Sequence, residues 1–442
     1  MSRSRRGGPI SVRAGPPQIV RAVLDNGVAV VLCPSAHLAQ TYVAVYFGVG
    51  SRHETADNNG VTHSLEHMLF RGTDSHRDAT ELNSAAEAFG GFLEGATYRD
   101  HLYFATGCHP SAVGSAIAIL GELVASPRYQ GLEIERAILR EELLETVDQY
   151  GRMIDLDNIA HRAVFGSQGL GLPIEGTLDN LEAVTLEQLE AHRDEFLVGD
   201  NAVVSIAGPI DPDRALTQIR RAFGGLRSGT APLVGTPALP TADPVMRYVR
   251  DASSQVEIRI SFRAVPIQHP GFPPLVMLGR LLGDGLASRM NADLVDRRGL
   301  AYSLHAGLTR YADCALFDFE ISVAPDRAAE AVAAILDFAR SSSRFRYTAD
   351  EMRRVRRRYK YSMEFRSDSV ADLAAWHGCA TLFGIDDQLD TLGRRINRID
   401  GGAIRAAARD LFRREGLVIA AAGQLARGEW SRVRRVVERW RV

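Results

Sequence analysis

The chain has 442 residues, of which 45% are hydrophobic, and a formal net charge of −2 at pH 7. This length exceeds what one ordinary hydrophobic core fills and suits two or more domains. The balanced charge gives no reason to expect nucleic acid or an anionic membrane as a partner, and no run approaches the roughly 18 consecutive apolar residues that a membrane span needs.

The first 17 residues form a basic extension that we expect to precede the folded domains. Its arginines are followed by Gly7, Gly8 and Pro9 in place of the apolar segment of a secretory signal. The four cysteines of the chain are scattered without C-x-x-C spacing, which suits a reducing compartment and excludes both a disulfide framework and a cysteine zinc site. We therefore predict a cytoplasmic protein.

Apolar runs predict strands at 28–32 and 41–47, and a helix follows them that carries the motif His63-Ser64-Leu65-Glu66-His67. Residues four apart on a helix lie on the same face, so both imidazoles can reach one metal ion with Glu66 beside them. The alternative is a surface helix with two solvated histidines. An apolar stripe on the opposite side favours a helix packed against a core; its members are Val61, Leu65, Met68 and Leu69.

Further helices are predicted at 79–89, 111–125, 132–150 and 186–196. The helix at 132–150 carries several glutamates among isoleucines and leucines. A largely buried carboxylate needs a cation or metal to offset its desolvation, and catalytic zinc needs a third protein ligand besides two histidines. We therefore predict that this helix supplies the third ligand.

The two halves of the chain contain a sequence repeat. The segment 194–210 and the segment 410–425 each contain a helix end, a short apolar strand and a glycine, at an offset of 215 to 216 residues. A proline- and glycine-rich stretch at 227–244 separates the halves and reads as a linker. We predict an N-terminal zinc-binding catalytic domain at 18–226 and a homologous substrate-binding domain at 245–442.

The second half repeats the mixture of strands and helices. A half-buried strand is predicted at 256–262, helices at 275–282 and 327–341, and an amphipathic closing helix at 427–441. Strands alternating with helix pairs predict an α+β fold. Each of the two homologous domains is expected to be a mainly antiparallel sheet with helices packed on one face.

These motifs resemble those of the pitrilysin/insulinase-type zinc metallopeptidases, in which H-x-x-E-H is followed some 75 residues later by a glutamate ligand on a helix. The likeness is strongest to their short-chain branch, which contains the mitochondrial processing peptidase and its bacterial relatives, and it runs almost end to end. The matching blocks are Gly50 to Glu54, Gly60 to Thr73, Gly90-Gly91 with Thr97 and Tyr103, and Leu170-Gly171 with Pro173 and Gly176-Thr177.

The resemblance implies one zinc ion per chain, held by His63, His67 and a glutamate of the second helix. Glu142 stands seven residues after Glu135, on the same helical face, and 74 residues separate it from His67. Glu141 fits the local Leu-Arg-Glu string instead. We choose Glu142, because the ligand and its supporting carboxylate must lie on one face of the helix, and keep Glu141 as the alternative. The resemblance also implies two catalytic carboxylates: Glu66 as the general base, and Glu135 as electrostatic support of the ligand helix.

In the second half, Asp296 to Tyr302 resembles the block of the family that binds substrate across the cleft from the zinc. Arg298 and Tyr302 are its candidate substrate-binding residues. Without the family, Arg298 reads as a solvated helix-end residue and Tyr302 as half-buried packing. The chain departs from the family at Leu93-Glu94-Gly95, where relatives usually carry Leu-Asn-Ala, so Glu94 puts the substrate preference in doubt.

The resemblance implies a zinc-dependent endopeptidase that cleaves unstructured peptides, or leader and presequence segments, added as a strand to the sheet edge at 90–97. Full-length family members enclose substrate between two units of two such domains each, and this chain corresponds to only one unit. We therefore expect a homodimer, or a heterodimer with a related subunit. Two rival functions are a non-catalytic assembly subunit, like the core proteins of respiratory complexes, and a peptide-binding chaperone whose zinc is structural.

Overall fold

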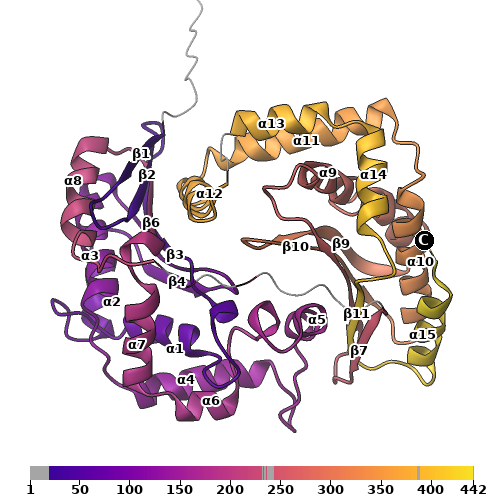
Figure 1. The fold of residues 1–442 in the computed structure, drawn as a ribbon, viewed down its shortest axis with the longest axis horizontal. Coiled ribbons are helices and arrows are strands. Elements are labelled where there is room, and N and C mark those ends of the chain that lie inside the picture. Colours follow the sequence, from indigo (N-terminus) through magenta and orange to yellow (C-terminus); the bar gives the residue numbers. More distant parts are fainter. Residues whose placement is uncertain (1–18, 231, 233–234, 236–242, 386–388, 442) are drawn as a thin grey trace, which may run out of the picture.

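The computed structural model describes residues 19–230, 232, 235, 243–385 and 389–441. The two halves of the chain each build one sheet with helices, and the two sheets face one another (Figure 1). The predicted extension at 1–17 lies outside the described residues, as does much of the predicted linker at 227–244, so both boundaries stay predictions. Within the described part, every helix is too short or too polar to span a membrane.

The first sheet has six strands in the order β1-β2-β6-β3-β5-β4, which makes β4 an edge strand. All neighbouring pairs are antiparallel except β2 and β6, which run parallel. The strands are β1 (Val20–Val23), β2 (Ala29–Pro34), β3 (Thr41–Phe47), β4 (Leu93–Thr97), β5 (Leu102–Cys108) and β6 (Ala202–Gly208).

Helices of the first half cover one face of this sheet and enclose an aliphatic core between the two layers. Within this core, α1 buries Leu65, Met68 and Leu69 completely, and α3 packs against α8. The helices of the first half are α1 (Val61–Leu69), α2 (Ala79–Glu87), α3 (Val113–Ala125), α4 (Leu132–Glu145), α5 (Leu156–Phe165), α6 (Leu178–Ala183), α7 (Leu186–Phe196) and α8 (Pro212–Phe223). Of these, α5 packs on the second sheet instead.

The second sheet has five strands in the order β7-β11-β8-β10-β9, with β9 at an edge. Its strands are β7 (Val245–Val249), β8 (Val256–Ala264), β9 (Ala301–Arg310), β10 (Ala315–Val323) and β11 (Leu417–Ala422). Its helices are α9 (Phe272–Leu282), α10 (Ala328–Ser342), α11 (Ala349–Arg366), α12 (Val370–Leu382), α13 (Leu389–Arg398), α14 (Gly401–Leu411) and α15 (Glu429–Arg439).

The predicted repeat is visible in this topology. The two apolar strands that suggested it are β6 and β11, and each lies between one parallel and one antiparallel neighbour. Helix contacts repeat as well: α1 touches α4, α7 and β4, as α9 touches α11, α14 and β9. The chain is thus an α+β fold of two similar domains, as predicted.

The predicted one-sided helix layer is completed by an exchange between the halves. Helix α12 of the second half packs on the free face of the first sheet, where Val370, Leu373 and Ala374 join a cluster with β2, β3, β5 and β6. Helix α5 of the first half packs on β7, β8 and β11 in the same way. Each sheet is therefore covered on its second face by a helix of the other half (Figure 1).

The predicted element bounds agree with the structure except near turns. The strand at 41–47 and the helix at 186–196 have the predicted bounds. The helix predicted at 132–150 ends at Glu145, because the chain turns back through Gly151 at φ +73° and pairs Val147 with Met153. The helix predicted at 275–282 begins earlier, at Phe272, where a proline in the first turn favours initiation.

Candidate metal centre

Helix α1 presents both motif histidines from one side. Its apolar side is buried, with Leu65 inaccessible to solvent, so the helix has one rotational setting on the core. His63 and His67 lie one turn apart on the other side and are 14% and 18% exposed. The alternative of two fully solvated histidines on a surface helix is therefore wrong.

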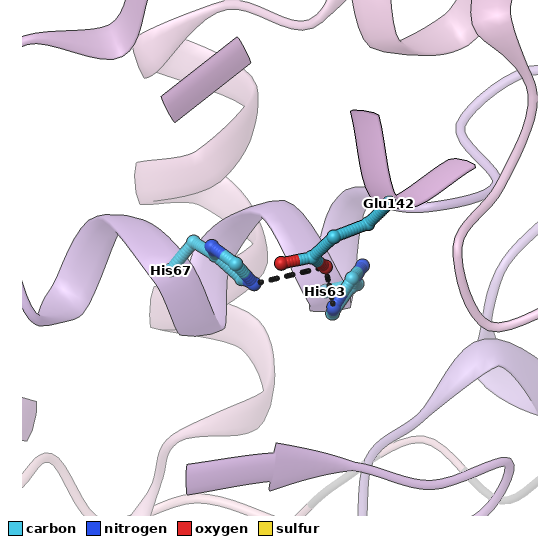
Figure 2. Close-up of side chains that lie close together, drawn as sticks. All are labelled: His63, His67 and Glu142. Atoms are coloured by element: carbon cyan, nitrogen blue, oxygen red, sulfur yellow. Dashed lines mark ion pairs between the residues drawn. The ribbon is translucent and has the colours of Figure 1, made fainter. Parts of the chain in front are cut away.

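A carboxylate from α4 reaches the space between the two rings (Figure 2). Oε2 of Glu142 lies 3.7 Å from Nε2 of His63 and 3.6 Å from Nε2 of His67. Within the described part of the chain, these three residues are the one group of His, Cys, Asp or Glu side chains whose donor atoms converge, all within 4.8 Å of one another. Glu142 remains 46% exposed, so the group is open on one side.

The two candidate glutamates point differently. Glu142 joins the histidine pair, whereas Glu141 is exposed and takes no part in the group. The reason is the helical period: seven residues, about two turns, bring Glu142 onto the face already used by Glu135. Its neighbour is rotated away by about 100°.

Glu135 holds the second histidine from behind. Its Oε2 lies 3.1 Å from Nδ1 of His67, and its Oε1 accepts a 3.0 Å hydrogen bond from Nη1 of Arg71. Glu135 is buried, and the guanidinium of Arg71 compensates its charge. With the proton of the ring on Nδ1, Nε2 of His67 is left with its lone pair facing Glu142. Glu135 therefore reaches the group through His67.

Glu66 faces the edge strand. Its Oε2 accepts a 2.7 Å hydrogen bond from Oγ1 of Thr97, the last residue of β4. A side chain at Gly95 would come within 3.2 Å of Oε1 of Glu66, so glycine keeps this strand close to the carboxylate. The motif glutamate, the histidine pair and the edge strand thus meet in one place.

Burial shifts the pKa values of His63 and Glu66. It lowers the pKa of His63 to about 3, with the neighbouring His67 contributing in the same direction. His63 is thus neutral near pH 7 and can offer a lone pair to a metal. Burial also raises the pKa of the Glu66 carboxyl, although the hydrogen bond from Thr97 opposes the shift. A raised pKa suits a group that takes up and returns a proton.

Glu54 caps the N-terminus of α1. Its Oε2 accepts 2.7 Å hydrogen bonds from Nδ2 of Asn59 and from the backbone N–H of Gly60, and its Oε1 accepts one of 2.9 Å from the N–H of Thr62. The buried carboxylate therefore satisfies first-turn donors of α1 and complements the positive end of the helix dipole. Gly60, at φ +98°, leaves room for the backbone of Gly176.

The second-half candidates stand apart from this group. Arg298 follows the short π-helix Asn291–Arg297, is 46% exposed and pairs with Asp293 at 2.6 Å. Tyr302 lies near the start of β9 and is 88% exposed, so it is not the half-buried packing residue of the alternative interpretation. Neither contacts the histidine pair among the interactions of the described residues.

Sequence reasoning missed three of the supporting roles. Arg71, Thr97 and Glu54 lie within the motif blocks, but nothing in the spacing of Thr97 or Glu54 indicates a contact. Only Arg71, four residues after His67, carried a local signal, since a residue there falls near the same helical face. The contact between Glu66 and Thr97 spans 31 positions and depends on the sheet.

Two family models match the chain and together cover more than half of it. The model described as insulinase (peptidase family M16) matches residues 30–178, and the model described as the peptidase M16 inactive domain matches residues 183–359. The first match contains the histidine pair, Glu66, Glu135 and Glu142.

Individual relatives agree with the models. An uncharacterized zinc protease of Streptomyces coelicolor is 27% identical over 89% of this chain and 87% of its own length. The beta subunit of the mitochondrial-processing peptidase of Dictyostelium discoideum is 26% identical over 93% and 90%. The crystal structure of a protease from Helicobacter pylori has the same fold, with a TM-score of 0.85 at 19% identity, over 92% of this chain and all of that one.

Both the zinc-protease name and the subunit name thus occur among relatives that match this chain nearly end to end. The chain belongs to the insulinase family, peptidase family M16, in the branch that resembles the mitochondrial processing peptidase.

Proposed function

We propose that this protein is a zinc-dependent endopeptidase in which His63, His67 and Glu142 hold one zinc ion per chain. The observation that carries the proposal is the convergence of these three donors within 4.8 Å on a group that is open on one side. Two imidazoles and one carboxylate suit catalytic zinc, which keeps a further position for water or substrate. The zinc-protease names of the relatives support the same metal.

The residues around the group are arranged for hydrolysis. Bound zinc would supply Lewis-acid activation of the attacking water and of the scissile carbonyl. Glu66, held by Thr97, takes the proton from the water and gives it to the leaving amine. Glu135 keeps the His67 ring in the orientation and tautomer that the metal requires.

The edge strand β4 suggests how substrate is held. Its backbone groups on the open side face no neighbouring strand of the sheet, so an extended peptide can add there and run past Glu66. Unstructured peptides and leader or presequence segments can present such a strand, whereas folded proteins cannot. Arg298 and Tyr302 would bind the same peptide from the second half.

The test compares product formation from a mixed peptide library, measured by mass spectrometry, between the wild-type protein and Glu66→Gln. The variant should keep zinc and lose hydrolysis. Glu142→Gln should lose both, while Glu141→Gln, on the same helix and outside the group, serves as the matched control and should retain both. Unchanged hydrolysis by Glu66→Gln would contradict the mechanism. Zinc without hydrolysis in the wild-type protein would favour the rival functions of assembly subunit or chaperone.

We also propose that the active form is a dimer, either of two copies or with a related subunit. One chain contains a single pair of sheets, and the Dictyostelium relative is itself named a subunit. Mass photometry of the isolated protein separates monomer from dimer. Hydrolysis by the protein expressed without a partner would select the homodimer, and hydrolysis only on addition of a related chain would select the heterodimer.

A further inference from the structure

The second half contains a cavity at the position that corresponds to the metal centre. The metal centre lies among α1, α4 and β4, and the repeat pairs these elements with α9, α11 and β9. A cavity of about 400 Å³ lies among α9, α11, β9 and α12. It contains no histidine pair of the H-x-x-E-H kind. Its charged lining consists instead of the arginines Arg280, Arg310 and Arg366, with His305 and Asp284.

The single carboxylate of this lining is already shared. Asp284 pairs with Arg280 at 3.2 Å and with Arg358 at 3.0 Å. Arg280 also lies over the ring of Tyr359, with its guanidinium carbon 5.0 Å from the ring centroid. The cation at Arg280 is therefore compensated within the protein.

Two guanidinium groups are not compensated. Arg366 stacks over the ring of Trp376 at 5.3 Å and has no carboxylate partner among the described residues. The side chain of Arg310, the last residue of β9, makes neither an ion pair nor a hydrogen bond within that part of the chain, and this exposed residue lines the cavity. Desolvation by the surrounding protein and the charge of Arg366 lower the pKa of Arg310. Two like charges held near one another in a cavity favour binding of an anion.

The remainder of the cavity suits a peptide more than a bare ion. Leu308 and Arg310 are two residues apart on β9 and therefore lie on the same face of that strand, which is an edge strand of its sheet. Leu275 and Val276 of α9 add apolar surface on the opposite wall. An extended backbone can therefore add along β9 with an apolar side chain in the cavity and an anionic group at the arginines.

We infer that this cavity binds the carboxylate of a peptide whose backbone extends along β9, with Arg310 and Arg366 as the groups that hold the anion. The inference rests on the proposed function in that the ligand is a peptide. The carboxylate belongs either to the C-terminus of the peptide or to an acidic side chain near it. The second half would thus hold one end of a substrate by charge, at the place where the first half holds the metal.

The experiment measures binding of fluorescent peptides by anisotropy to the full-length Glu66→Gln protein, so that no peptide is consumed. Two peptides of identical sequence end in a carboxylate or in a carboxamide, and a third is a carboxamide with glutamate as the penultimate residue. If the carboxylate is the C-terminus, the free acid should bind at least about tenfold more tightly than the plain carboxamide, since a charge-assisted pair lowers the Kd by about that factor. If it is an acidic side chain, the glutamate peptide should show that gain instead. The glutamate peptide tells which source of carboxylate is used: tight binding assigns an acidic side chain, and weak binding assigns the C-terminus.

The preference should disappear when Arg310→Gln or Arg366→Gln is added. Arg353→Gln is the matched control, because Arg353 lies on α11 like Arg366 but is 70% exposed and pairs with Asp350; it should leave the preference intact. Thermal unfolding should show no loss of stability for Arg310→Gln, since removing the charge relieves repulsion. Equal binding of all three peptides, or a preference that survives Arg310→Gln, would overturn the inference. Absence of hydrolysis by the wild-type protein would instead contradict the proposed function, and the two failures are therefore distinguishable.

Discussion

Nδ1 of His67 lies 3.1 Å from Oε2 of Glu135, two turns of α4 before Glu142. One helix thus provides both the third donor of the metal group and the carboxylate that orients one of the histidines. This double role makes the rotation of α4 about its axis the geometric variable on which the metal centre depends. A substitution at either glutamate is expected to lower the affinity for zinc more than it lowers the stability of the fold.

Glu135→Gln should weaken zinc binding by roughly 10- to 100-fold, because the amide orients the His67 ring less firmly and lowers its basicity. Competition with a chromogenic chelator measures the affinity. Glu133→Gln is the matched control, since Glu133 lies on the same helix with its side chain 81% exposed. An unchanged affinity in Glu135→Gln would show that the contact with His67 has no role in the metal centre.

Removing zinc should lower the melting temperature by several degrees. A ligand present at 100 times its Kd stabilises the folded state by about 2.7 kcal/mol, and 1 kcal/mol corresponds to about 2–4 °C for a domain of this size. Differential scanning fluorimetry with and without a chelator measures the shift, and added zinc should restore it. Glu142→Gln should show no response to the chelator; a full response there would exclude Glu142 as a ligand.

Glu54→Ala should destabilise the protein by about 2–4 kcal/mol, because backbone donors of Gly60 and Thr62 would be left buried without an acceptor. Since these donors begin α1, zinc affinity should fall as well. Urea denaturation measures the first effect. Glu54→Gln, which retains one carbonyl acceptor, should be intermediate, and equal stability of all three proteins would contradict the capping role.

Glu94→Gln should change the substrate preference and leave the affinity for zinc unchanged. Along β4, Gly95 and Thr97 face Glu66, whereas Glu94 lies on the other face and accepts a hydrogen bond from Tyr42. A peptide added beside β4 places alternate side chains on that second face, next to the Glu94 carboxylate. We expect kcat/KM to fall about tenfold for peptides with lysine or arginine at that position and to stay unchanged for leucine. An equal loss for both peptides would indicate a structural effect.

Asp157→Asn should loosen the contact between the halves in a pH-dependent manner. Asp157 on α5 pairs with Arg99 at 2.8 Å and also with Arg259 of β8. Burial tends to raise the pKa of this carboxyl, but His161 and the two arginines outweigh it and hold the pKa well below its usual range. A depressed pKa means that the stabilisation is complete above about pH 4 and is lost as the pH falls further.

The wild-type protein should therefore exceed Asp157→Asn by about 1–2 kcal/mol at pH 7, a modest value because Asp157 is 44% exposed and solvent screens its charge. The difference should shrink as the pH is lowered from 4. Chemical denaturation at pH 7, 5 and 3.5 measures it. A difference that is constant over this range would show that the charge of Asp157 does not carry the effect.

The local patterns predicted much of the fold and of the candidate site. The stripe through Leu65 and Met68 predicted the orientation of α1, and the seven-residue interval between Glu135 and Glu142 predicted which glutamate approaches the histidines. Both signals arise within one helix, where spacing in sequence fixes direction in space.

The features that could not be predicted depend on contacts between distant segments. Helix α12 carries buried residues on more than one side, and only the first sheet explains why Ser205 donates to the carbonyl of Ala374. Likewise, the hydrogen bond from Thr97 to Glu66 exists because the edge strand packs against α1. Such relationships follow from the tertiary arrangement, which local periodicity does not contain.

The exchange of α5 and α12 joins the two halves by packing, in addition to the covalent connection between α8 and β7. Each half contributes a helix that the other half needs to cover its sheet, and Gly378 lets α12 approach Tyr46 and Ser205 closely. Two separate fragments, divided after α8, would each expose the apolar sheet face that a helix of the other fragment covers. The protein therefore resembles an intertwined heterodimer whose two subunits are joined in one peptide chain.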